Sequence, residues 1–168
     1  MQEYAFLIDI NTTLWQIKQS CHPSFKYFSR RSFPMDSKEF IYFRKKLNKT
    51  QKQIAQLLGT SLKAIHSYEQ GWRSVPPSVE RQIFFLVSRT SEIKKHRKTC
   101  WAIKKCSPDQ KAQCPAWEFK AGKLCWFING TICEGSVQKN WKEKMKICRS
   151  CEVFLTCFNV KRRTFLPA

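Results

Sequence analysis

The stretch TQKQIAQLLGTSLKAIHSYEQG, residues 50–71, carries the start and stop signals of two short helices. Thr50 and Gln53 have the spacing of a capping box, in which each side chain binds a backbone N–H of the other residue. Gly59 ends the first helix, because glycine readily adopts the left-handed conformation found after helix termini. A second helix then begins at Ser61. The stretch therefore predicts two short helices joined by a tight turn.

Apolar residues recur along this stretch at helical spacing and define one buried face. The small Ala55 falls where the two helices would cross closely, and Gly71 ends the second helix. Two short helices packed around a glycine turn in this way form a helix-turn-helix. The expected inward-facing residues are Ile54, Ala55, Leu58, Ile65 and Tyr68.

Helical periodicity continues on both sides of the motif. Before it, Asp36 or Ser37 would cap a preceding helix. After it, Pro77 occupies a first-turn position of a closing helix. The neighbouring Phe84 and Phe85 would serve either a dimer contact or core packing. The expected core positions of the two flanking helices are Phe40, Phe43, Leu47, Ile83, Leu86 and Val87.

These residues resemble the Cro-type, or Xre-like, helix-turn-helix family of phage repressors over residues 37–87. The TQ opening, the alanine at the crossing, the glycine turn and the E-x-G close stand where the family has them. The resemblance implies a domain that binds double-stranded DNA with its second motif helix in the major groove. It also implies a homodimer on two half-sites and an ion pair between Arg44 and Glu69 that ties the first helix to the recognition helix.

The resemblance places the DNA contacts around the second motif helix. Gln51 takes the position that contacts the DNA backbone, and Leu62, Lys63 and Ser67 take positions that read base edges. Leu62 offers only apolar contact, and Trp72 replaces a usually polar or basic residue, so the operator sequence does not follow. A helical domain without DNA affinity is the alternative. The full expected set is Gln51, Thr60, Ser61, Leu62, Lys63, His66, Ser67, Gln70, Trp72 and Arg73.

The chain is strongly basic, with 31 Lys and Arg against 12 Asp and Glu and a formal net charge of +19. A field of this sign favours a polyanion, and nucleic acid is the commonest one. A solvated basic surface is the plain alternative. No apolar run of about 18 residues is present, which argues against a membrane span. Because the N-terminus lacks the basic start of a secretory signal, we expect a cytoplasmic protein.

Eight of the nine cysteines and four of the six tryptophans fall between residues 100 and 157. In a reducing compartment dense cysteine more often ligates metal than forms disulfides. So small a segment has little apolar volume, and metal ligation would supply folding free energy on the order of 10 kcal/mol. Only Cys148 and Cys151 have the C-x-x-C spacing that chelates one ion from a single turn. The expected ligands are Cys100, Cys106, Cys114, Cys125, Cys133, Cys148, Cys151 and Cys157.

The segments CWAIKKC (100–106), CP (114–115), CWFINGTIC (125–133) and K-x-x-x-C-R-S-C (144–151) resemble the two-CW domain. As a family pattern it includes seven of these cysteines and leaves Cys157 least secure. Four thiolates accept either Zn²⁺ or a [4Fe–4S] cluster, and the all-cysteine set with this resemblance slightly favours iron–sulfur. Trp101 and Trp126 would shield such a centre or simply pack the core.

The expected organisation is a mainly α chain. A four-to-five-helix repressor-type helix-turn-helix domain spans 35–92, a basic linker 93–99, and a small irregular cysteine-rich metal-bound domain 100–158. Residues 1–34 form an extension, either a mis-assigned start upstream of Met35 or a flexible arm, and 159–168 form a basic tail.

Taken together, these patterns predict a sequence-specific DNA-binding transcription regulator. Its cysteine module would sense redox state or metal, or would only stabilise the chain. The alternative is an antitoxin or adaptor whose structural zinc module binds a protein. No Ser-His-acid set or carboxylate pair emerges around His22, His66 or His96, so we expect no enzyme.

Overall fold

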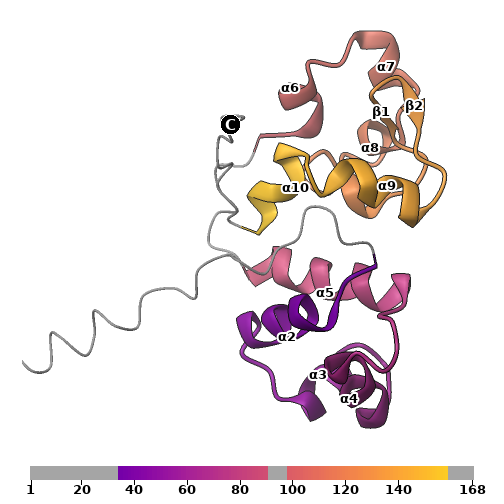
Figure 1. Cartoon of the computed structure of the whole chain (residues 1–168). Coiled ribbons are helices and arrows are strands. Elements are labelled where there is room, and N and C mark those ends of the chain that lie inside the picture. The colour runs from indigo at the N-terminus through magenta and orange to yellow at the C-terminus, as the bar shows by residue number, and fades with distance from the viewer. Residues whose placement is uncertain (1–33, 91–97, 159–168) are drawn as a thin grey trace, which may run out of the picture.

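The computed structural model describes residues 34–90 and 98–158, which form two mainly helical halves (Figure 1). The expected extension before Pro34, most of the basic linker and the basic tail lie outside the described residues. The first half contains α2 (Ser37–Lys46), α3 (Gln51–Leu57), α4 (Leu62–Gln70) and α5 (Pro77–Thr90). The second half contains α6 (Cys100–Lys104), α7 (Pro108–Ala112), α8 (Pro115–Glu118), η2 (Cys125–Phe127), β1 (Ile132–Cys133), β2 (Ser136–Val137), α9 (Trp141–Cys148) and α10 (Glu152–Cys157).

Local capping sets the helix boundaries of the first half, as expected. The Asp36 side chain accepts a backbone hydrogen bond of 2.7 Å from the first turn of α2. Thr50 and Gln53 form the reciprocal capping box at the start of α3. Gly59 and Gly71 adopt left-handed φ angles of +59° and +75° where α3 and α4 end. The predicted helix, glycine turn and second helix are therefore confirmed.

The core of the first half lies between α2, α3, α4 and α5. Ile54 and Ala55 of α3 and Ile65 and Tyr68 of α4 are buried, as the apolar spacing predicts. The Tyr68 ring also meets that of Phe40 in α2 edge-on, with the centroids 5.8 Å apart. α2 thus packs directly on the second helix of the motif.

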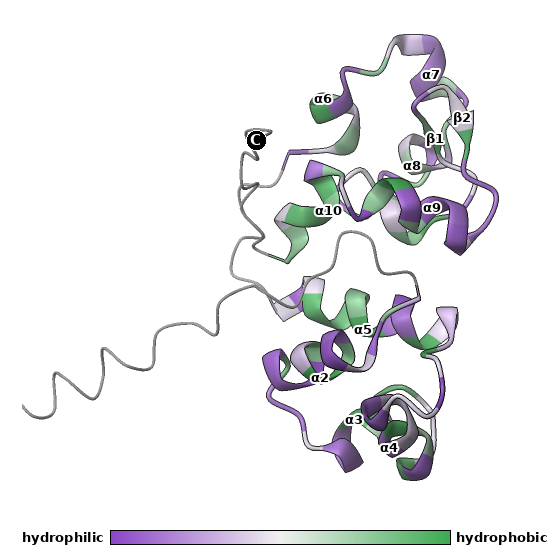
Figure 2. Cartoon of the chain, viewed as in Figure 1, coloured by the Kyte–Doolittle hydropathy of each residue, from purple (hydrophilic) through white to green (hydrophobic). Residues whose placement is uncertain are grey.

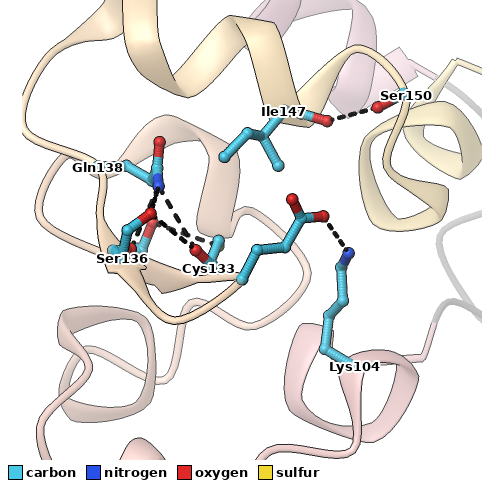
Figure 3. A network of polar contacts seen from close by, with 8 residues as sticks. Lys104, Cys133, Ser136, Gln138, Ile147 and Ser150 are labelled. Atoms are coloured by element: carbon cyan, nitrogen blue, oxygen red, sulfur yellow. Dashed lines mark hydrogen bonds and ion pairs between the residues drawn. The ribbon is translucent and has the colours of Figure 1, made fainter.

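The second half is built from short helices around one small hairpin. β1 pairs with β2 in antiparallel register, with Cys133 opposite Ser136. Glu134 and Gly135 connect the strands with φ angles of +53° and +76°, the backbone that a two-residue hairpin turn of the primed type requires. Figure 3 shows the Gln138 amide folded back on this hairpin, where its Nε2 donates to the Ser136 carbonyl at 3.2 Å. These contacts fix the backbone that carries Cys133.

The two halves share one hydrophobic core. Phe84 of α5 has no exposed surface, and its ring centroid lies 5.2 Å from that of Phe43 in α2. From the second half, the rings of Phe154 and Phe158 each approach Phe84 to 5.2 Å, and Trp126 approaches to 6.3 Å. Figure 2 shows hydrophobic positions along α5 and α10, the helices that lie at this junction. For Phe84, core packing is therefore confirmed.

α5, with 14 residues, is the longest helix of the described ranges. Within those ranges, no helix combines the length and the apolar character needed to cross a membrane.

Candidate DNA-binding surface and cysteine cluster

α4 has one buried face and one exposed face. Its N-cap Ser61 accepts a hydrogen bond of 3.1 Å from the backbone N–H of Ala64, which fixes the start of the helix. Ala64, Ile65 and Tyr68 are buried against the core. Lys63 points from the other face into solvent. A helix in this setting can offer its exposed face to a groove of DNA while its buried face holds it in place.

The ten side chains expected to contact DNA all have exposed or half-buried surface. Trp72 is 77% exposed, the largest value among the large apolar side chains of the described residues, and Leu62 is 44% exposed. The other exposed side chains are Ser61, Lys63, His66, Gln70 and Arg73, whereas Gln51, Thr60 and Ser67 are half-buried.

An ion pair ties the first helix to α4. Arg44 Nε donates to Glu69 Oε1 at 2.5 Å, and Arg44 Nη1 donates to the Lys49 carbonyl at 2.9 Å. The two charged side chains are 14% and 6% exposed. The pair predicted for these positions is confirmed, and it joins α2 to the C-terminal part of α4.

Two of the expected DNA contacts are also bound within the protein. Gln51 Nε2 donates to Glu69 Oε2 at 2.6 Å, and Ser67 Oγ donates to the Lys63 carbonyl at 2.9 Å. Gln51 keeps its amide oxygen and a second N–H, and Ser67 keeps its acceptor lone pairs. Both side chains are therefore held in position while still able to bind a duplex.

Residues 41–81 match a family model described as helix-turn-helix. Within this segment, α3 and α4 form a helix-turn-helix motif. The match spans most of α2, the motif itself and the start of α5, and it indicates a DNA-binding transcription regulator. It does not reach the cysteine-rich half, for which the resemblance to the two-CW domain stays a prediction. No curated protein and no solved structure matches the chain.

Outside the helix-turn-helix domain, five cysteines line one cavity together with Lys104 and Thr131. They come from separate elements of the second half, so the fold rather than local spacing brings them together. Figure 3 shows Lys104 of α6 reaching across to the hairpin, where its Nζ lies 3.3 Å from Glu134 Oε1. The five lining cysteines are Cys100, Cys106, Cys114, Cys125 and Cys133.

Cys100 and Cys125 form a hydrogen-bonded thiol pair. This hydrogen bond, helped by backbone N–H groups and Lys144, lowers the pKa of Cys100 to about 7 despite its burial. The same hydrogen bond, together with burial, raises the pKa of Cys125. The two thiols therefore shift each other's pKa in opposite directions.

The C-x-x-C turn adds two more thiols. Burial raises the pKa of Cys148 to about 12, and the nearby charge of Lys144 acts against that rise. Cys151 is half-buried and lies close enough to Cys133 and Cys148 to influence the pKa of both thiols. Seven of the eight expected ligands therefore lie in one connected region.

Cys157 lies apart from these seven. Its Sγ lies 3.2 Å from the Val153 carbonyl, within hydrogen-bonding range for a thiol donor. Its side chain is fully buried in the shared aromatic core and does not line the cavity. Of the eight predicted ligands, Cys157 is therefore the one that lies outside the connected region.

Lys144 of α9 is enclosed by the cysteine cluster. The side chain has no exposed surface, and its Nζ donates to Thr131 Oγ1. The ammonium acts to lower the pKa of four surrounding thiols, those of Cys100, Cys125, Cys133 and Cys148. Among the described residues, no carboxylate lies within ion-pair distance of this nitrogen.

The buried Lys144 among these thiols is chemically suited to a negatively charged centre built from thiolates. A buried ammonium without a compensating negative charge is strongly unfavourable. Thiolates around Lys144 can supply that charge. In the part of the chain that the structure describes, however, no three Cys, His, Asp or Glu side chains converge on one point that would hold a metal ion.

Sequence reasoning missed two buried basic residues of the second half, Lys144 and Arg149. Both belong to the K-x-x-x-C-R-S-C segment, so their presence beside the C-x-x-C turn was visible. Their burial was not, because basic residues in a chain of net charge +19 are expected on the surface. The presence of basic residues within the span of a cysteine motif is the signal that could have found them.

Proposed function

We propose that the chain is a sequence-specific transcription regulator that places α4 in the major groove of double-stranded DNA. The observation that carries this proposal is the exposed face of α4 within a segment that matches the helix-turn-helix family model. The net charge of +19 supports it, because each phosphate contact by Lys or Arg releases counterions and adds affinity.

Within this proposal the exposed residues have different roles. Lys63 and Leu62 reach base edges, Lys63 through its ammonium and Leu62 through apolar contact with a thymine methyl. Gln51, held by Glu69, contacts the DNA backbone at the start of α3. Arg73, exposed after α4, lies near phosphate and contributes affinity without reading sequence.

In vitro selection from a random duplex library tests this function, because the operator sequence is unknown. The wild-type chain should enrich one motif, and fluorescence anisotropy should then show tighter binding to it than to a scrambled duplex. Lys63→Ala should reduce that preference, whereas Lys142→Ala, an exposed lysine of α9, should not. Recovery of no motif, with equal affinity for all duplexes, would reject sequence-specific binding.

The cysteine cluster is proposed to hold a metal centre. Cys100, Cys125, Cys133 and Cys148 are the candidate ligands because all four surround Lys144, and Cys151 can contribute from the same turn as Cys148. Four thiolates around Zn²⁺ or a [4Fe–4S] cluster carry net negative charge and would offset the ammonium. Such a centre would also supply folding free energy to a half with little apolar volume.

Anaerobic purification with metal analysis and an absorbance spectrum distinguishes the two centres. Iron with a broad visible band indicates a cluster, and colourless protein with zinc indicates a zinc site. Cys148→Ala should lose the metal, whereas Cys157→Ala should retain it, although both replace a buried thiol. Wild-type protein that contains no metal under these conditions would reject the proposal. The centre can act as a sensor of redox state or metal only if a change in its state alters DNA binding by α4; otherwise it only stabilises the chain.

Exposed aromatic residues favour a second candidate function. Trp117 is 45% exposed and Phe119 is 66% exposed, both in the cysteine-rich half. An antitoxin or adaptor would use such residues to bind a protein through a structural zinc module. A co-purifying partner that is lost in Trp117→Ala and Phe119→Ala, together with bound zinc, would support this function over a stand-alone regulator.

A further inference from the structure

Arg149 connects the cysteine-rich half to the helix-turn-helix half. It is 1% exposed, and it lies in the C-x-x-C turn between Cys148 and Cys151. Its Nη1 donates to Glu39 Oε1 at 2.8 Å and to Oε2 at 3.0 Å, and its Nη2 donates to Glu80 Oε1 at 2.6 Å. Because Glu39 lies on α2 and Glu80 on α5, one guanidinium holds both helices.

The surroundings of this contact are closed to solvent. Glu39 and Glu80 have no exposed surface. Trp141 Nε1 donates to the remaining oxygen, Glu80 Oε2, at 3.0 Å, so each of the four carboxylate oxygens accepts a hydrogen bond. The Arg149 guanidinium also lies 5.4 Å from the ring centroid of Phe84. Removal of the guanidinium would leave two buried carboxylates without their cation, a strongly unfavourable state.

α2 extends this contact to the DNA-reading helix. Glu39, which binds Arg149, and Arg44, which binds Glu69 of α4, lie on the same helix. Phe40, next to Glu39, packs its ring on Tyr68 of α4. A continuous set of ion pairs and packed rings therefore runs from the C-x-x-C turn to α4.

On the basis of the proposed function, we propose that Arg149 is a positioning residue that makes DNA binding by α4 depend on the state of Cys148 and Cys151. Cys148 precedes Arg149 directly and Cys151 follows two residues later, so a change in what these thiols bind moves the backbone of the turn. The guanidinium then leaves Glu39 and Glu80. α2 thereby loses the Arg149–Glu39 ion pair that sets its position against α4. By linkage, a bound duplex must in turn stabilise the arrangement of the two thiols.

The test uses the full chain and two variants that each remove one positive charge. Arg149→Met breaks the contact, and Lys146→Met is the matched control, because Lys146 is exposed on α9, the helix that ends directly before Arg149. DNA affinity is measured by anisotropy on the selected duplex. The rate of alkylation of Cys148 and Cys151 by N-ethylmaleimide is measured by peptide mass spectrometry with and without that duplex. Arg149→Met should weaken DNA binding about tenfold, and Lys146→Met far less. The duplex should slow alkylation of both thiols in wild type and in Lys146→Met, but not in Arg149→Met.

A second variant covers the case in which Arg149→Met does not fold. The combination of Glu39→Gln, Glu80→Gln and Arg149→Met removes all three buried charges, and such a neutral replacement is often tolerated. This variant should fold, as judged by circular dichroism, yet show no effect of the duplex on alkylation. A folded variant of either kind with wild-type affinity and duplex-dependent protection would overturn the role of Arg149 alone. Wild-type protein that binds no duplex would reject the proposed function, and this role with it.

Discussion

The helix starts of the two halves differ in what caps them. In the helix-turn-helix half, α2, α3 and α4 each begin with a side chain that accepts a backbone hydrogen bond. In the cysteine-rich half, α7 and α9 have such a cap, whereas α6, α8 and α10 have none and each starts at or next to a cysteine. Short uncapped helices have little stability of their own. The second half therefore depends on contacts between its elements and on its thiols, whereas the first half is specified helix by helix.

Removal of the proposed metal is the change that separates the two halves most strongly. A structural metal contributes folding free energy on the order of 10 kcal/mol, so a chelator should abolish cooperative folding of the cysteine-rich half. The three capped helices of the first half, α2, α3 and α4, should persist in part, because their starts are set locally. Circular dichroism and limited proteolysis, before and after chelation, measure both effects. Identical proteolytic patterns with and without bound metal would contradict the expectation.

The shared aromatic core predicts the next largest effect. Phe84→Ala removes a fully buried ring that contacts both halves, and we expect a loss of about 3–5 kcal/mol in the free energy of unfolding. Phe85→Ala is the control, because this neighbour on α5 is 36% exposed, and its loss should be about 1 kcal/mol. Urea unfolding followed by circular dichroism gives both values. Equal losses in the two variants would show that the junction is not packed as described.

The two halves also differ in how far the sequence alone predicts them. Caps at Thr50 and Gly59 are local, and the family resemblance supplied the Arg44–Glu69 pair, so the helix-turn-helix half was predicted nearly in full. Arg149 binds Glu80 and Glu39, which lie 69 and 110 residues away in the chain. No local pattern indicates a contact of that separation.

The cysteine cluster was predictable as a set but not in its arrangement. Cysteine density set residues 100–157 apart as a cysteine module, and seven of its eight thiols lie in one region of the fold. The buried charge of Lys144 and the separate place of Cys157 depend on tertiary packing. The position of the Lys144 ammonium among the cysteines therefore follows from the three-dimensional structure and not from the sequence.

The buried carboxylates at the junction predict a pH dependence of smaller size. Burial raises the pKa of Glu39 from 4.5 to about 7; of the charged groups that face it, Arg149 acts against this rise, and Glu80 and Asp36 add to it. The folded state then holds a proton that the unfolded chain has lost. The stabilisation that this proton gives the folded state is complete below pH 4.5 and is lost as the pH rises through 7. The free energy of unfolding then falls by up to about 3 kcal/mol.

Glu39→Gln isolates this effect, since glutamine cannot titrate. Unfolding free energies between pH 5 and about 8 should slope downward in wild type and be flatter in the variant. A slope that survives unchanged in Glu39→Gln would assign the pH dependence to other groups. The difference in pH dependence between wild type and Glu39→Gln thus measures the Arg149–Glu39 contact between the halves and not the stability of either half alone.

One capping box in each half gives the smallest and most direct comparison. Thr50 and Gln53 form one at α3, and Ser107 and Gln110 form another at α7. Loss of such a cap typically costs about 1 kcal/mol, so Thr50→Ala and Ser107→Ala should each lower the melting temperature by a few degrees. If the shared core makes the chain one cooperative unit, both variants will shift a single transition by similar amounts. Two transitions, each sensitive to only one of the variants, would show that the halves unfold independently and that the Arg149 contact does not join them in solution.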